Sequence, residues 1–307
     1  MVQIAERALA QGISQKDNLK ERVVSAAKRR FMPGIIERST RELFHRSGYE
    51  HIALLKEPLD EGNVLLIAMA HESLGDLGPA VDVFKEVRVK FPQIEGGKYI
   101  LAKSIQSGKQ GEYTKSGFQT LAQRLLERNN IDPLFVTSTN DIERGEIPTA
   151  EEAEEFVLAL KNPKRAVLLH PQANMEAGRI NKETGKRNDA GPIDKNVAKV
   201  IANRIRRNTP IVVLPVGLYG SARLYDPTER KITKEGKNLI KDTEVARLIG
   251  DPNMLPEKIG FIKVERPYLL SDLNAYADPI QEFMQRIVIG IPPENRGIYI
   301  DALRGKR

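Results

Sequence analysis

The chain has 307 residues, of which 40% are hydrophobic and 29% charged, a composition typical of folded globular proteins and long enough to bury a sizeable core. It contains no cysteine, which excludes disulfides, thiolate metal sites and a cysteine nucleophile. The formal net charge of +7 would attract nucleic acid, anionic lipid or an acidic partner. Charge alone does not choose among these partners.

The first part of the chain, residues 1–50, is predicted to form a small basic helical region. Pro33 and Gly34 interrupt its helical pattern, and a second helix is expected from Ile35 to about His45. Residues 51–307 are predicted to form the main domain.

This main domain alternates short apolar runs with longer amphipathic ones. Helices are expected around residues 118–126, 150–160, 197–205 and 280–291. Thr149 and Glu152 form a capping box, which supports the second of these helices. The alternation predicts an α/β fold with a mostly parallel sheet flanked by helices. The expected strands are His51–Leu55, Val64–Ala70, Leu134–Val136, Ala166–Leu169, Ile211–Val216 and Phe261–Val264.

A histidine and an aspartate follow the most apolar of these strands. His71 comes directly after Val64–Ala70, at the strand end where α/β sheets bind ligands. Asp76 lies five positions later, across a turn that Gly75 and Gly78 are expected to make flexible, and its carboxylate could fold back onto the imidazole. Imidazole, with an ordinary pKa of ~6.5, is suited to take a proton from a hydroxyl. The alternative is structural: His71 closes a turn and Asp76 caps the next helix.

The surrounding sequence resembles the superfamily of glycerol-phosphate and lysophospholipid acyltransferases over roughly residues 50–300. The first motif of that family, N-H-x-S-x-x-D, is matched by His71, Ser73 and Asp76, with Ala70 in place of asparagine. Three further segments resemble features of the family and occur in the same order. Tyr99–Lys103 resembles the family's "aK" strand, Thr209–Val216 resembles its V-P-I-V-P-V strand, and Ile291–Tyr299 resembles its L-P-P-E-Y-R-G-x-Y tail.

Two family motifs are altered in this sequence. The arginine of the second motif, which in the family helps to hold the acceptor phosphate, is replaced by Ser138, and Arg144 lies six residues further on. The third motif, F-P-E-G-T-R, falls at His170 and Pro171. Read without a gap, both of its charges are lost. Read with a four-residue insertion, Glu176 and Arg179 supply its E-x-x-R part.

The resemblance implies transfer of a fatty acyl group from acyl-CoA or acyl carrier protein to a hydroxyl of glycerol 3-phosphate or a lysophospholipid, in phospholipid biosynthesis. His71 would be the general base and Asp76 its partner. No cofactor is expected beyond the acyl donor, and no metal, because His71 lacks partner ligands at zinc-like spacing. The expected substrate-binding residues are Ser73, Lys103, Arg144, His170, Pro171, Glu176 and Arg179.

Two alternatives come from other functional classes. The altered motifs favour a non-catalytic lipid-binding module on the same fold, whereas the His71–Asp76 pair favours an enzyme. Nucleic-acid binding is suggested only by the charge, since aromatic residues make up 6% and no stacking or helix-turn-helix motif is found. The longest wholly apolar run, Val64–Ala70, is far shorter than the ~20 residues of a membrane span. We therefore expect a cytoplasmic protein that binds reversibly to an anionic membrane surface.

Overall fold

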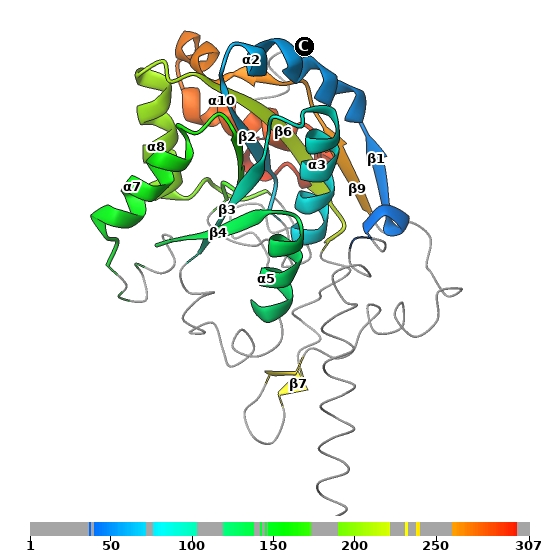
Figure 1. Cartoon of the computed structure of the whole chain (residues 1–307). Coiled ribbons are helices and arrows are strands. Elements are labelled where there is room, and N and C mark those ends of the chain that lie inside the picture. The colour runs from blue at the N-terminus through cyan, green and yellow to red at the C-terminus, as the bar shows by residue number, and fades with distance from the viewer. Residues whose placement is uncertain are drawn as a thin grey trace, which may run out of the picture.

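An eight-stranded sheet forms the centre of the protein (Figure 1). Its strands follow the order β1-β9-β6-β2-β5-β3-β4, and β10 pairs with β6 beside this path. The computed structural model describes residues 37, 40–71, 76–102, 119–137, 142, 145, 147–172, 190–221, 231–232, 238–239 and 260–299.

The elements have the following bounds. The strands of the main sheet are β1 (Phe44–Ser47), β2 (Val64–Met69), β3 (Gly96–Ala102), β4 (Ile131–Val136), β5 (Arg165–Leu169), β6 (Ile211–Tyr219), β9 (Gly260–Val264) and β10 (Tyr268–Leu269). The strands β7 (Lys231–Ile232) and β8 (Asn238–Leu239) pair separately. The α-helices are α2 (Lys56–Asp60), α3 (Leu77–Lys90), α5 (Gln119–Arg128), α7 (Ala150–Ala159), α8 (Lys195–Arg206) and α10 (Pro279–Val288). The 3-10 helices are η1 (Tyr49–Leu55), η7 (Leu270–Ala275), η8 (Pro293–Asn295) and η9 (Gly297–Tyr299).

The sheet is mostly parallel. Strand β2 lies between β5 and β6 and runs parallel to both, and β3 runs parallel to β4 and β5. Antiparallel pairs join β6 to β9 and to β10. All six residues of β2 are buried, as expected for a central parallel strand covered on both faces. The predicted α/β fold, a mostly parallel sheet flanked by helices, is confirmed.

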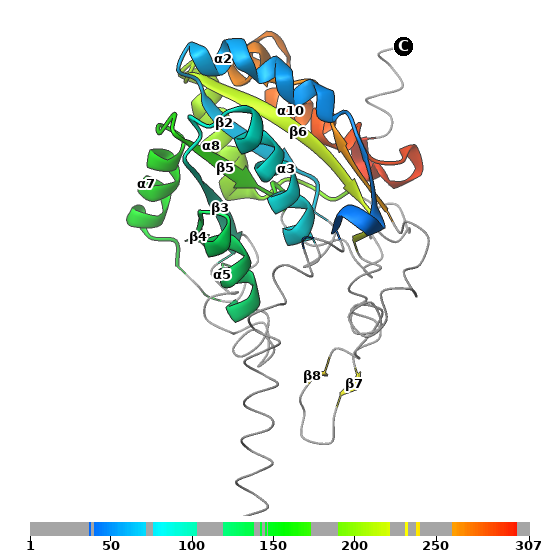
Figure 2. The same cartoon turned by 45° about the vertical axis from the view of Figure 1, so that its right-hand side comes forward.

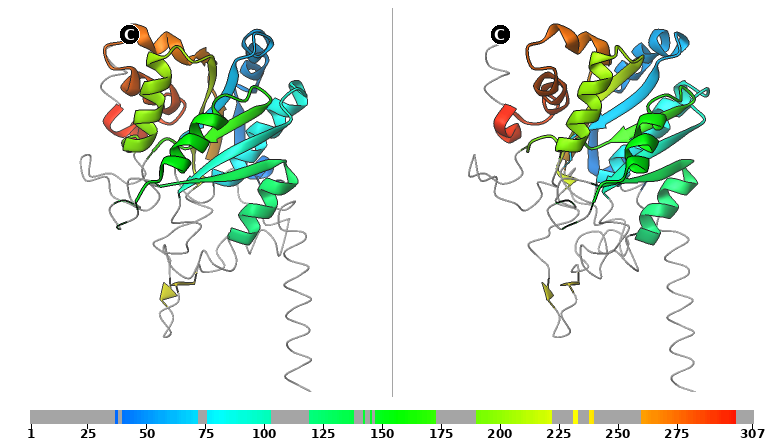
Figure 3. Two further views of the ribbon diagram at one scale, coloured as in Figure 1. Left: turned by 60° about the vertical axis from the view of Figure 1, so that its left-hand side comes forward. Right: turned by 90° about the vertical axis from the view of Figure 1, so that its left-hand side faces the viewer.

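Helices cover both faces of this sheet. Helices α3 and α5 lie on one face, and α8 and α10 lie on the other (Figures 2 and 3). Phe84 of α3 is completely buried, next to Gly97 of β3 and Leu168 of β5. Helix α3 begins directly after Asp76, so its packing fixes where this aspartate lies relative to the sheet.

Near the start of the described chain, one prediction is wrong and one helix boundary differs. Residues 51–55, expected as a strand, belong to the 3-10 helix η1. The helix expected up to His45 ends at Leu43, and His45 lies in β1. Strand β1 pairs in parallel with β9, about 215 residues later, and this distant partner decides its conformation. The main sheet thus includes residues before position 51, where the main domain was predicted to begin.

Within the described residues, no helix combines the length and the apolar character that crossing a bilayer requires.

Candidate active site

Three neighbouring strands bring polar side chains to one edge of the sheet. His71 follows β2, His170 follows β5, and Ser221 lies two residues beyond β6. Because β5, β2 and β6 are adjacent and parallel, their carboxyl ends meet at this edge. In open α/β sheets this edge is where ligands bind.

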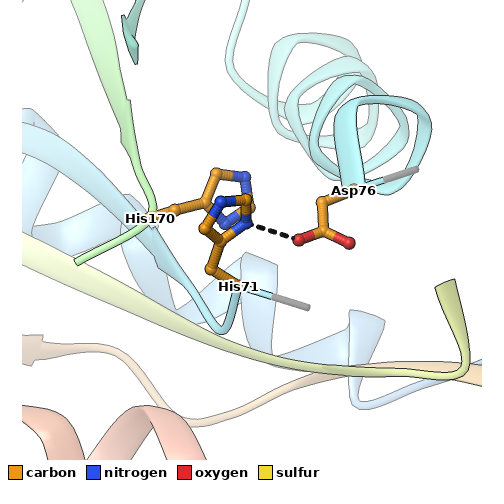
Figure 4. Close-up of side chains that lie close together, drawn as sticks. All are labelled: His71, Asp76 and His170. Carbon is orange, nitrogen blue, oxygen red and sulfur yellow. Dashed lines mark hydrogen bonds and ion pairs between the residues drawn. The ribbon is translucent and has the colours of Figure 1, made fainter. Parts of the chain in front are cut away.

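The side chains of His71 and Asp76 are in contact, as their spacing led us to expect. His71 Nδ1 lies 2.7 Å from Asp76 Oδ2 (Figure 4). Asp76 takes the N-cap position of α3 and is only 1% exposed, whereas the His71 side chain keeps 20% of its surface accessible. The histidine is therefore the member of this dyad that a substrate can reach.

The environment of Asp76 favours its ionised form. Burial by itself would raise the pKa of this carboxyl, but hydrogen bonds from His71 and Ser221, together with the charges of His71 and His170, lower the pKa below its ordinary value. An anionic Asp76 accepts a hydrogen bond from the Nδ1–H of His71. This fixes the tautomer of His71 and leaves the lone pair on Nε2, where a base needs it.

His170 lies beside His71 and is held by three hydrogen-bond partners. The two rings are 4.7 Å apart between centroids. His170 Nδ1 lies 3.1 Å from the carbonyl oxygen of Met69 and 3.2 Å from that of Ala70, so it must carry a proton and donate. Its Nε2 is then the acceptor for the hydroxyl of the buried Tyr99, 2.6 Å away. With both nitrogens engaged, His170 can contact a substrate only through its ring surface.

The surroundings of His170 keep it neutral. Desolvation, followed by the charge of His71, lowers the pKa of His170 to about 4, although Asp76 and the carbonyls of Ala70 and Met69 act in the opposite direction. The ring retains some exposure at the surface, but protein atoms surround it closely enough for desolvation to dominate. At neutral pH, His170 therefore adds no positive charge that would oppose proton uptake by His71.

The low pKa of His170 makes stability depend on pH. Between about pH 6.5 and about pH 4 the unfolded chain binds a proton on this residue and the folded protein does not, so stability falls as the pH falls through this range. Across this range the unfolding free energy falls by at most ~3 kcal/mol, and the partial exposure of the ring makes the loss smaller. The variant His170→Asn lacks this titrating group. The difference in unfolding free energy between the wild type and the variant should therefore become smaller as the pH falls. Urea unfolding of both proteins across this range would show it. A constant gap would contradict the assignment.

His71, Asp76 and His170 together form a group that could in principle hold a metal ion, with ligand atoms all within 4.8 Å of one another. His170 lies far from His71 in the sequence, and the fold brings the two side chains together. The contacts do not fit a cation, however. The 2.7 Å separation of His71 Nδ1 and Asp76 Oδ2 is that of a direct hydrogen bond, and both nitrogens of His170 already have partners. The arrangement is that of a hydrogen-bond network.

Two polar residues of this site, Gln172 and Ser221, were not predicted to be functional from the sequence. The side-chain oxygen of Gln172 accepts a hydrogen bond from the backbone N–H of His71, and Ser221 Oγ donates to Asp76 Oδ1. Gln172 stands at the glutamate position of the ungapped third motif, and Ser221 follows the strand that resembles the fourth. Their positions after predicted strands indicated that both residues lie near the site. The sequence did not indicate that Gln172 contacts His71 or that Ser221 contacts Asp76.

The predicted substrate-binding residues divide into two groups. His170 and Pro171 lie at the end of β5, beside His71, and Pro171 is buried with its carbonyl accepting from the N–H of Asp194. The others stay predictions, since they lie outside the described residues. They are Ser73, Lys103, Arg144, Glu176 and Arg179, together with Ser138 of the altered second motif.

Comparison with known proteins does not identify a family for this chain. No protein-family model matches the chain, and a search of curated proteins returns no match.

Proposed function

We propose that this protein is an O-acyltransferase that moves a fatty acyl group from a thioester, on coenzyme A or acyl carrier protein, to an alcohol of the glycerolipid type. The observation that carries the proposal is the contact between His71 Nδ1 and the buried, ionised Asp76 at a ligand-binding sheet edge. A binding module needs no base, whereas acyl transfer to a hydroxyl does. The resemblance of the sequence motifs supports the same reaction.

The reaction follows from the lone pair on Nε2 of His71. This nitrogen takes the proton of the acceptor hydroxyl while the oxygen attacks the thioester carbonyl, and Asp76 stabilises the imidazolium that forms. The tetrahedral intermediate then expels the thiolate as the carbon–sulfur bond breaks. The departing sulfur takes the proton from His71, which restores the neutral base. An ester and a free thiol are the products, and no covalent enzyme intermediate is needed.

The acceptor is proposed to be glycerol 3-phosphate or a lysophospholipid at an anionic membrane surface. A desolvated phosphate needs compensating positive charge. Lys103, Arg144 and Arg179 are proposed to supply it, as each follows a strand whose carboxyl end lies at the His71 edge: β3, β4 or β5. Arginine suits this role because its guanidinium matches phosphate oxygens in two-point contacts.

The test is release of free thiol from acyl-CoA and from acyl carrier protein, followed with a thiol-reactive dye. The chain has no cysteine, so the protein itself gives no background signal. Glycerol 3-phosphate, lysophosphatidate and a neutral monoacylglycerol are compared as acceptors, with and without anionic vesicles. We expect acceptor-dependent thiol release that is greatest with a phosphorylated acceptor. Preference for the neutral alcohol would remove the phosphate from the proposal. Vesicle binding without any thiol release would favour the non-catalytic lipid-binding module.

A further inference from the structure

Ser221 is the third member of a chain of hydrogen bonds that begins at His71. Its Oγ donates to Asp76 Oδ1, while Asp76 Oδ2 faces His71 Nδ1. Ser221 is completely buried and Asp76 nearly so. We propose that Ser221 is a positioning residue, which holds the Asp76 carboxylate in the orientation that prepares His71 for proton uptake. This inference deepens the proposed acyl transfer and rests on it for its role in catalysis.

The fold supplies Ser221 from a strand next to that of His71. Strand β6 pairs with β2 as far as Met69 and Val216, and the chain turns away after Tyr219. Gly220 makes this turn with a φ of 92°, a conformation that residues with a side chain rarely adopt. The serine therefore approaches Asp76 from the strand on the opposite side of β2 from β5, which carries His170.

The chemistry of a buried carboxylate explains why a second donor matters. A carboxylate has two oxygens, and a buried oxygen without a partner costs free energy. If only Oδ2 were bound, the group could rotate about its Cβ–Cγ bond and weaken its contact with His71. A hydroxyl on Oδ1 satisfies this oxygen and restricts the rotation. Asp76 and Ser221 each make further interactions, so loss of the hydroxyl should weaken this support without abolishing it.

Ser221→Ala tests the proposal through the titration of His71. Without the hydroxyl, the Asp76 carboxylate can rotate, and its contact with the imidazolium of His71 becomes weaker. His71 should therefore bind its proton at a lower pH than in the wild type. NMR titration of the imidazole signals measures this without any substrate, and the chain has only four histidines to assign. In the acyl-transfer assay, kcat should fall by about tenfold or more, with the acid side of the pH profile displaced to lower pH.

Tyr49→Phe is the matched control. It also removes a hydroxyl that donates to a carboxylate held by helix α3, since Tyr49 Oη lies 2.9 Å from Oδ2 of the buried Asp82. Asp82 is six residues along the chain from Asp76 and bonds to Arg41 and Arg46, away from His71. This control should lower stability and leave both the His71 titration and the pH profile where they are in the wild type.

The outcomes separate this proposal from the proposed function. An unchanged His71 titration in Ser221→Ala overturns the positioning role, even if acyl transfer is observed. A displaced titration supports it, even if every acyl acceptor fails and the proposed reaction is abandoned. Ser221→Thr keeps the hydroxyl and should restore the wild-type titration. If Ser221→Ala does not fold, Ser221→Cys, with a side chain of similar size and a weak donor, serves the same NMR experiment.

Discussion

Replacement of His71 by alanine is expected to lower kcat for acyl transfer by about 10²–10⁴-fold, the usual contribution of a general base. The change also removes a hydrogen-bond partner of the buried Asp76, so the melting temperature should fall, and kcat is measured well below it. Asp76→Asn should have an effect of similar size, because an amide can present its N–H₂ to Nδ1 and favour the wrong tautomer of His71. Thiol release and product formation with saturating acceptor measure both variants.

His45→Ala is the matched control for the His71 replacement. His45 lies on β1, exposed, at the edge of the sheet formed by β1 and away from the carboxyl end of β2. It should keep the full rate, which shows that loss of an imidazole elsewhere is harmless. Wild-type turnover in His71→Ala or Asp76→Asn would end the proposed mechanism.

Gly48→Ala is expected to cause the largest loss of stability among the glycine substitutions, on the order of 3–4 kcal/mol. Gly48 joins β1 to η1 with a φ of 71°, and a Cβ atom there would lie 1.9 Å from the carbonyl oxygen of Val264. That carbonyl also binds His51 Nδ1 at 3.0 Å. The methyl group must therefore push β9 away from the chain that follows β1, which disturbs the pairing of β9 with β1 and the fully buried Phe44 in that strand. Urea unfolding followed by circular dichroism gives the free energy.

Gly62→Ala is the control that distinguishes the steric clash at Gly48 from the cost of a left-handed backbone conformation. Gly62 has a φ of 83°, also in the left-handed region, but nothing lies within 4 Å of an added Cβ atom. Its cost should be only that of placing alanine in this conformation, ~1 kcal/mol. If Gly48→Ala and Gly62→Ala lost the same unfolding free energy, the contact between the methyl group and β9 would not be destabilising.

Patterns of apolar residues in the sequence predicted much of the central fold. The runs that became β2, β5 and β6 are wholly apolar because these strands are covered on both faces, and such runs can be recognised locally. Thr149 also caps α7 as expected, with Oγ1 accepting from the N–H of Glu152. The Glu152 carboxylate, however, also accepts from both donors of Thr137 at the end of β4, a tertiary contact that the capping pattern does not contain.

The sequence by itself therefore determined the α/β class and the pairing of His71 with Asp76, since these residues are only five positions apart and local geometry is enough to join them. Only the tertiary structure decided which other groups surround this pair. His170, Tyr99, Gln172 and Ser221 come from three different strands or their ends, and their contacts depend on strand order and register. The same holds for β1, which became a strand through its distant partner β9. Sheet pairing joins residues 34 positions apart in β3 and β4 and 216 positions apart in β1 and β9, and a local pattern does not show which strand will lie next to which.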